Sequence, residues 1–164
     1  MARQAASARS ELQALRRTLV DRGLTICAAE SCTGGLLCAA LTDLPGSSDY
    51  FLAGAVTYSN AAKVAHLGVA EATIAAHGAV SREVAAQMAR GARTRFGADV
   101  ALSVTGVAGP GAEGEKPLGL TFIGCAVLDR VEVRQYNWSG DRPSNREASV
   151  EAALALANEL LSTQ

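Results

Sequence analysis

Hydrophobic residues change their spacing along the chain in a way that separates helices from strands. Across residues 5–22, Leu12, Leu15 and Leu19 recur at helical spacing, and Gly23 follows as a helix stop. Short apolar runs without helical spacing instead predict strands over 24–29, 51–58, 99–104, 120–128 and 131–138. The pattern therefore predicts an N-terminal helix followed by about five strands.

Segments between these strands carry the signals of helices. Helices are predicted over 34–42, 60–68, 69–77, 82–96 and from about 145 to 161. Ser81 is the expected N-cap of the fourth, and Ser144 with Glu147 has the spacing of a capping box for the last. The last two strands are joined by Asp129 and Arg130 alone, which predicts an antiparallel hairpin. Residues 1–164 are thus expected to form one three-layer α/β/α domain with a mixed sheet.

Composition narrows the class of protein. The chain of 164 residues is 49% hydrophobic but only 4% aromatic, and its net charge is −1. It has no basic field for nucleic acid, no polybasic run for a membrane surface and no signal peptide, so we expect a cytoplasmic protein. No apolar stretch approaches the roughly 20 residues that span a bilayer. Alanine-rich helices with few large side chains favour a homodimer or a higher homo-oligomer.

Four cysteines, Cys27, Cys32, Cys38 and Cys125, fit neither a CxxC pair nor a zinc ligand set, so no metal or other cofactor is predicted. Only Cys32 lies in a glycine-rich turn, where it is an alternative nucleophile. A catalytic cysteine needs a nearby histidine. The chain has only His66 and His77, on predicted short helices where surface positions are expected.

Ser31-Cys32-Thr33-Gly34-Gly35 joins a buried strand to a helix. Free N–H groups and a partial positive charge at a helix N-terminus attract anions, and glycine lets a phosphate approach. The turn is therefore either a phosphate site or a tight turn in which Ser31 or Thr33 caps the helix.

A long glycine- and proline-rich loop over 105–119 follows another buried strand and opens with Thr105 and Gly106. Loops of this length inside a compact domain are usually functional. Ligands of α/β sheets lie beyond the carboxyl ends of the strands, so this loop and the 31–35 turn are expected to face one crevice. Gly109 to Gly114 has the spacing of a P-loop, but Glu115 occupies the lysine position, so a P-loop is rejected.

A serine hydrolase also needs a base. With no convincing Ser/His/Asp set, the candidate catalytic group is Ser48, Tyr58 and Lys63, because a buried lysine can replace histidine. Ser48 is the predicted nucleophile, since it precedes the strand that leads to Tyr58 and Lys63 whereas Ser31 suits phosphate binding. The base is Lys63, or Tyr58 relayed by Lys63. The alternative interpretations are a solvated lysine and a half-buried aromatic.

Two arginines, Arg142 and Arg146, flank the start of the last helix, where positive charge opposes the helix dipole. An anionic ligand would relieve this conflict, and so would pairing with Asp141 and Glu147. With Thr33, Gly34 and Thr105, either arginine could hold a phosphate.

Six segments in order resemble the CinA C-terminal domain family over about residues 12–161. They are Ala29–Gly35, Pro45–Ser48, Val56–Asn60 with Lys63, Thr105–Pro110, Lys116–Gly119 and Gly140–Arg142. One departure is Asn145, where the family pattern leads us to expect an aliphatic residue; we expect it to affect how the last helix docks rather than the chemistry. Many CinA proteins carry an additional N-terminal domain for which 164 residues leave no room, so a stand-alone domain is expected.

The resemblance implies an amidohydrolase that converts nicotinamide mononucleotide to nicotinate mononucleotide and ammonia. The substrate would be held by Ser31, Thr33, Gly34, Gly35, Thr105, Gly106, Arg142 and Arg146. Two other classes remain open: a non-enzymatic nucleotide-binding module, and an interaction protein in DNA uptake or repair. Ammonia release separates the first from both others, and the neutral charge argues against direct DNA contact.

Overall fold

The computed structural model describes residues 2–111, 114 and 116–163. Its five strands form one sheet in the order β2-β1-β3-β4-β5. Their bounds are β1 Ile26–Glu30, β2 Phe51–Val56, β3 Val100–Gly106, β4 Leu120–Val127 and β5 Arg130–Asn137. β1 runs parallel to β2 and to β3, whereas β3, β4 and β5 are successively antiparallel. The predicted α/β fold with a mixed five-stranded sheet is confirmed.

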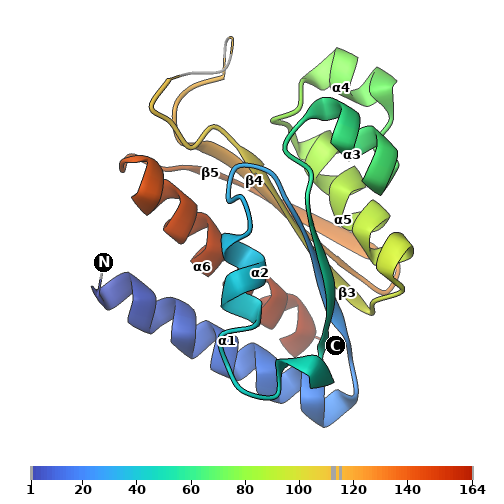
Figure 1. Cartoon of the computed structure of the whole chain (residues 1–164), viewed down its shortest axis with the longest axis vertical. Helices are drawn as coiled ribbons and strands as arrows, with labels where there is room; N and C mark the ends of the chain where they lie inside the picture. Colours follow the sequence, from blue (N-terminus) through green and yellow to red (C-terminus); the bar gives the residue numbers. More distant parts are fainter. Residues whose placement is uncertain (1, 112–113, 115, 164) are drawn as a thin grey trace.

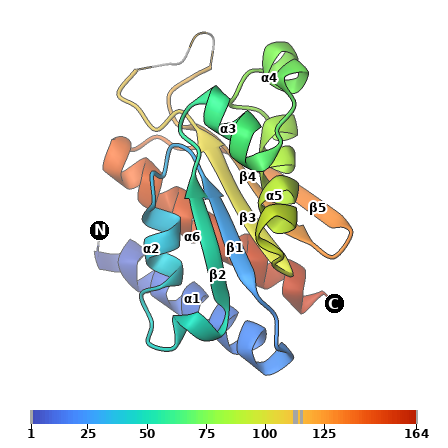
Figure 2. The same cartoon turned by 45° about the vertical axis from the view of Figure 1, so that its right-hand side comes forward.

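Helices cover both faces of this sheet (Figure 1). They are α1 Ala2–Arg22, α2 Leu36–Leu41, α3 Asn60–Leu67, α4 Glu71–His77, α5 Arg82–Phe96 and α6 Arg142–Ser162, with a 3₁₀ turn, η1, over Ser47–Asp49. α1, α2 and α6 share one hydrophobic core with one face of the strands. α5 packs on the opposite face, and α3 and α4 pack against α5 (Figure 2).

Small side chains allow the close packing that the low aromatic content predicts. A Cβ atom at Gly91 of α5 would overlap the Leu67 carbonyl of α3, and one at Gly54 of β2 would overlap the Cys38 sulfur of α2. Ala85, Ala89 and Ala92 place the apolar face of α5 against the sheet. The alanine-rich face of α5 is therefore buried within the chain.

The starts of α6 and α2 are among the helix starts that differ from the sequence prediction. α6 begins at Arg142 rather than after Ser144, because Asp141 is its N-cap and its carboxylate accepts the Ser144 N–H at 3.0 Å. The predicted capping box of Ser144 and Glu147 is therefore wrong. α2 begins at Leu36 because Gly34 and Gly35 both adopt positive φ angles, 58° and 100°, which an α-helix cannot contain.

Candidate active site

One end of the sheet gathers the segments that the sequence singled out. Because β1, β2 and β3 are mutually parallel, their carboxyl ends lie at the same edge, and the 31–35 and 107–111 segments extend from it (Figure 2). Between them is a cavity of about 300 Å³, at the lower end of the range of small-molecule sites. It is lined by Ser31, Cys32, Tyr58, Gly106, Val107, Ala108, Gly109, Gly111 and Arg142. Glu115 lies outside the described residues.

Ser31 lines this cavity, and its hydroxyl is hydrogen-bonded to the amine of Lys63, which is not itself among the lining residues. The Lys63 Nζ donates to Ser31 Oγ at 3.1 Å, and also to the carbonyl oxygens of Thr57 at 2.9 Å and Tyr58 at 3.4 Å. Lys63 is only 1% exposed and Ser31 8%. A serine hydroxyl within hydrogen-bonding distance of a buried lysine amine is an arrangement that can act as a nucleophile and its base.

Strand pairing fixes the position of Ser31, and a capped helix start fixes that of Lys63. Ser31 directly follows β1, and its N–H donates to the Val104 carbonyl of β3 at 2.9 Å. Lys63 lies in the first turn of α3, whose N-cap Ser59 accepts the Ala62 N–H. Ser31 therefore lies at a strand end and Lys63 in the first turn of a helix, rather than on a free loop.

Ser48 is not part of this arrangement. It is exposed in η1, which precedes β2, whereas Tyr58 and Lys63 follow β2. The six residues of β2 span roughly 20 Å, so the strand separates Ser48 from Lys63 instead of delivering it. The structure does not bring Ser48 together with Tyr58 and Lys63, so the expected grouping is wrong. Ser31 was the better candidate because it follows the strand adjacent to β2.

Tyr58 lies at the mouth of the cavity and is 58% exposed. Its phenol oxygen accepts a hydrogen bond from Arg142 Nη2 at 2.9 Å, and its backbone carbonyl, not its phenol, meets Lys63. The phenol thus lies beside the Arg142 guanidinium rather than between Ser31 and Lys63.

The start of α2 does not offer the predicted phosphate site, because Glu30 already occupies it. The buried Glu30 carboxylate accepts the N–H groups of Gly35, Leu37 and Cys38 at 2.8 to 3.1 Å. Thr33 is fully buried, and its hydroxyl has no hydrogen-bond partner within the described chain. Thr33, Gly34 and Gly35 therefore shape the turn, and only Ser31 and Cys32 of this segment line the cavity.

The two arginines make different contacts. Arg142 lines the cavity, and its Nη1 donates to the Gly109 carbonyl at 2.6 Å. Arg146 points to the turn instead, with Nη2 donating to the Thr33 carbonyl at 2.7 Å. Among the described residues neither pairs with Asp141 or Glu147. Arg142 is therefore a cation at the cavity whose described acceptors are uncharged.

Thr105 and Gly106 also have distinct positions. The hydroxyl of Thr105 is buried and donates to the Ala79 carbonyl at 2.9 Å, which ties β3 to the segment before α5. Gly106 lines the cavity, where a Cβ atom would approach Thr121 Oγ1 to 2.6 Å. Thr105 is therefore structural, and Gly106 lets β3 approach β4 closely at this point.

Cys32 lies next to Ser31, but burial raises the pKa of its thiol to about 11. Its thiol therefore stays protonated near neutral pH and is a poor nucleophile.

Within the described residues no group of three or more His, Cys, Asp or Glu side chains is arranged to hold a metal ion. None of the described helices is both long and apolar enough to cross a membrane.

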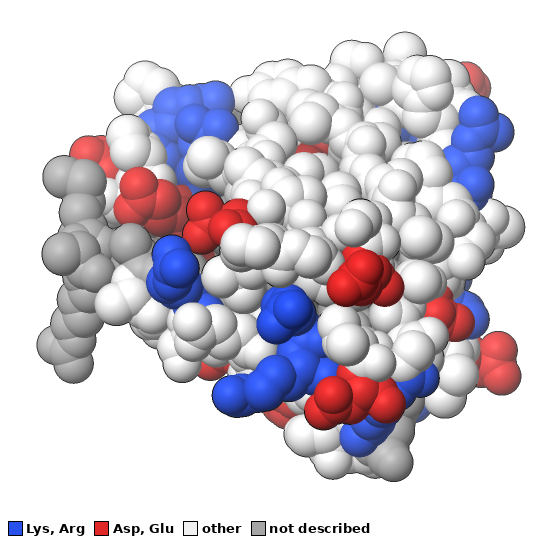
Figure 3. All heavy atoms as spheres, turned by 60° about the horizontal axis from the view of Figure 1, so that its bottom comes forward, with Lys and Arg blue, Asp and Glu red and all other residues white. Residues whose placement is uncertain are grey.

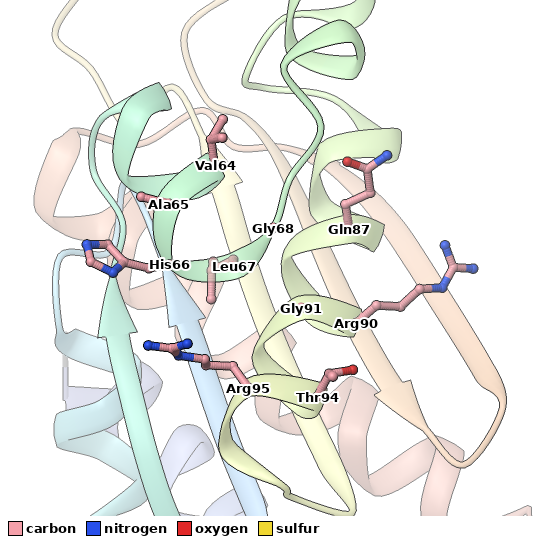
Figure 4. Close-up of a pocket in the computed structure, with 10 residues that line it drawn as sticks. All are labelled: Val64, Ala65, His66, Leu67, Gly68, Gln87, Arg90, Gly91, Thr94 and Arg95. Atoms are coloured by element: carbon pink, nitrogen blue, oxygen red, sulfur yellow. The ribbon is translucent and has the colours of Figure 1, made fainter.

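A larger hollow of about 550 Å³ lies between α3 and α5 but lacks this chemistry (Figure 4). Arg90 and Arg95 point to opposite sides of it, so their charges do not converge. The Gln87 amide is already engaged by the Ala70 N–H and the Thr73 hydroxyl. On the face in Figure 3, acidic and basic side chains alternate around an uncharged centre, without a field of one sign.

Comparisons with known proteins agree on one family. The model of the CinA C-terminal domain matches residues 9–161. A CinA-like protein of Chlorobaculum tepidum is 54% identical over 142 residues, 83% of this chain and 34% of that protein. A CinA-like protein of Chloroherpeton thalassium is 52% identical over 149 residues, 87% and 35%. The chain thus spans about a third of the length of these relatives.

Solved structures give the same answer for the fold. A competence-damaged protein (CinA) superfamily protein of Klebsiella pneumoniae superposes with a TM-score of 0.92 at 33% identity, covering 96% of this chain and 99% of that one. A competence/damage inducible protein of Agrobacterium tumefaciens superposes with a TM-score of 0.91 at 39% identity, covering 94% and 95%.

Proposed function

The chain belongs to the CinA C-terminal domain family, and from this membership and the geometry of the cavity we propose that it hydrolyses the carboxamide of nicotinamide mononucleotide. The products are nicotinate mononucleotide and ammonia. The observation that carries the proposal is the 3.1 Å contact between Ser31 Oγ and the buried Lys63 Nζ at a cavity of substrate size.

In the proposed reaction Ser31 is the nucleophile. This step requires Lys63 as the neutral amine, with its two N–H groups on the Thr57 and Tyr58 carbonyls and the Ser31 hydroxyl donating to Nζ. The Ser31 proton then passes to Nζ as Oγ bonds to the carboxamide carbon, and the carbonyl oxygen becomes an oxyanion. Collapse of this intermediate breaks the C–N bond, and Lys63 returns the proton to the departing ammonia. Water, deprotonated by Lys63, then hydrolyses the resulting ester and frees Ser31.

The turn after Ser31 supplies candidate donors for the oxyanion. The N–H groups of Cys32 and Thr33 have no carbonyl or carboxylate acceptor in the described part of the chain. A backbone N–H directly after the nucleophile is a common oxyanion donor, and its loss costs about 10²–10³ in kcat.

Serine chemistry with such donors requires no metal, so we expect full activity after exhaustive chelation. A loss of activity that a divalent ion restores would contradict this mechanism.

Arg142 is the proposed phosphate ligand, because its guanidinium lies at the cavity and its described acceptors are neutral. Tyr58 orients this guanidinium through its phenol oxygen. Arg146 would act indirectly, by holding the turn at Thr33.

The decisive experiment measures ammonia and nicotinate mononucleotide formed from nicotinamide mononucleotide by the purified chain. Ser31→Ala and Lys63→Met should each lower kcat at least about 10³-fold. Ser48→Ala is the matched control, since it removes a hydroxyl at the far end of β2, and it should keep near-normal kcat. An inactive Ser48→Ala with an active Ser31→Ala would instead identify Ser48 as the nucleophile, as the sequence predicts. Tight binding without ammonia release by the wild-type chain would instead indicate a non-enzymatic nucleotide-binding module.

A further inference from the structure

Asn145 is a buried polar residue in the first turns of α6, and both ends of its amide are hydrogen-bonded. Its Nδ2 donates to the Ala108 carbonyl at 3.2 Å, and its Oδ1 accepts the Gly140 N–H at 3.0 Å. The side chain is only 2% exposed. Burying an unpaired amide is costly, so these two bonds explain how a polar residue is accommodated where an aliphatic one was expected.

The Ala108 bond connects Asn145 to the cavity wall. Ala108 and Gly109 both line the cavity, and α6 binds their consecutive carbonyls through Asn145 and Arg142 respectively. At its other end the Asn145 amide holds Gly140, which lies two residues before Arg142. One side chain thus links the cavity wall to the segment that carries the cavity's arginine.

We infer that Asn145 is a positioning residue, whose amide fixes the 108–109 wall and the guanidinium of Arg142 in one relative geometry. The inference rests on the proposed function only for its effect on the substrate. It differs from the expectation that Asn145 affects helix docking alone, because the docking contacts of α6 lie along its apolar face, farther from the cavity.

The same residue is connected to a spectroscopic reporter. The Ser149 hydroxyl donates to the Asn145 carbonyl at 2.7 Å and accepts the indole N–H of Trp138 at 3.0 Å. Trp138 is the single tryptophan of the chain. Its fluorescence therefore reports whether this turn of α6 stays intact in a variant.

Two variants separate the halves of the amide. Asn145→Leu removes both hydrogen bonds. Asn145→Asp is nearly isosteric and can still accept the Gly140 N–H, but it cannot donate to the Ala108 carbonyl. Because both variants lose the hydrogen bond to the Ala108 carbonyl, both should raise the KM for nicotinamide mononucleotide about tenfold, with kcat within about twofold of wild type. Amide hydrogen exchange within 107–111 should accelerate in both, while Trp138 emission stays unchanged in Asn145→Asp.

Asn158→Leu is the matched control, since it removes an amide from the same helix that contacts Glu11 of α1 instead. It should lower stability without changing KM or the exchange of 107–111. Wild-type KM and exchange in Asn145→Asp would overturn the inference. If the wild-type chain does not turn over nicotinamide mononucleotide, the proposed function fails, but the exchange measurement still decides the role of Asn145.

Discussion

Two neighbouring side chains at the cavity, Ser31 and Cys32, differ in their fitness as nucleophiles. The pKa of the Cys32 thiol is raised to about 11 by burial, so at pH 7.5 only about 10⁻³ to 10⁻⁴ of it is thiolate. We predict that Cys32→Ala keeps kcat within about threefold of wild type, and that thiol reagents modify Cys32 in the folded protein only as pH rises toward 11. Steady-state kinetics and mass spectrometry after alkylation test this; a loss as large as that of Ser31→Ala would contradict it.

Arg142 carries the second residue-scale prediction. A charge-assisted contact to phosphate contributes about 1.5–3 kcal/mol, so Arg142→Met should raise KM for nicotinamide mononucleotide about 10- to 100-fold. Nicotinamide riboside, which lacks the phosphate, should be a poor substrate of the wild type and should be affected much less by the substitution. Equal kcat/KM of the wild type for both compounds would rule out a phosphate site. Arg95→Met, at an exposed position of α5, is the control for loss of a surface arginine.

Several of these residues could be identified from the sequence, but their partners could not. Lys63, Tyr58, Ser31 and Arg142 stood out because each follows or precedes a strand or helix boundary. Which serine meets the lysine depends on sheet order, since β1 lies between β2 and β3 and brings Ser31 beside the end of β2. No local pattern contains that information.

The N–H groups at the start of α2 are already hydrogen-bonded by a side chain of the same chain. Glu30 provides the anion that the helix N-terminus attracts, which leaves no room there for a ligand phosphate. Glu30→Ala would leave three N–H groups without their acceptor, so we predict a loss of about 3 kcal/mol in the free energy of unfolding and about 10 °C in Tm. Thermal denaturation followed by circular dichroism measures this. Glu147→Ala, at an exposed position of α6, should change stability by less than about 0.5 kcal/mol.

The start of α6 is pH-sensitive through its N-cap. Hydrogen bonding from Ser144 lowers the pKa of the Asp141 carboxyl below its ordinary value of 3.8. Because the folded state favours the carboxylate, its stabilising contribution is present above that ordinary value and is lost as pH falls through the lower folded value. We predict that acidification below pH 3.8 frays the first turn of α6. Faster amide exchange at 144–146 in wild type, with no such pH step in Asp141→Asn, is the expected result; an identical step in both would contradict it.

Element types were easier to predict than element ends. The β4–β5 hairpin was predictable because Asp129 and Arg130 leave no room for a crossover. The start of α6 was predicted three residues late because Ser144 and Glu147 imitate a capping box, while Asp141 followed by Pro143 is the actual start. Glu30 could have been found as an acidic residue four positions before the Gly34-Gly35 pair at the helix start.

At the scale of the whole molecule, the sheet is open at the β2 edge, and one face of β2 is also exposed. β2 pairs only with β1, and no charged residue occurs between Tyr50 and Ala62. Leu52 and Val56 are 48% and 49% exposed. Open, uncharged edge strands readily pair with another chain, and natural monomers usually block them with charge or proline.

We therefore predict a two-fold homodimer in which β2 of one copy pairs antiparallel with β2 of the other. The prediction depends on the strand edge rather than on alanine-rich helices, because the alanines on the apolar face of α5 are buried within the chain. A strand pairing with its own copy is self-complementary, as two-fold symmetry requires.

Light scattering at micromolar concentration should give a mass of about twice 16.8 kDa for the wild type. Leu52→Lys should shift the mass to the monomer value while leaving the circular dichroism spectrum unchanged, whereas Leu128→Lys, at the exposed β4–β5 turn, should not. A wild-type mass near 16.8 kDa would refute the dimer, and a dimer that survives Leu52→Lys would place the interface elsewhere.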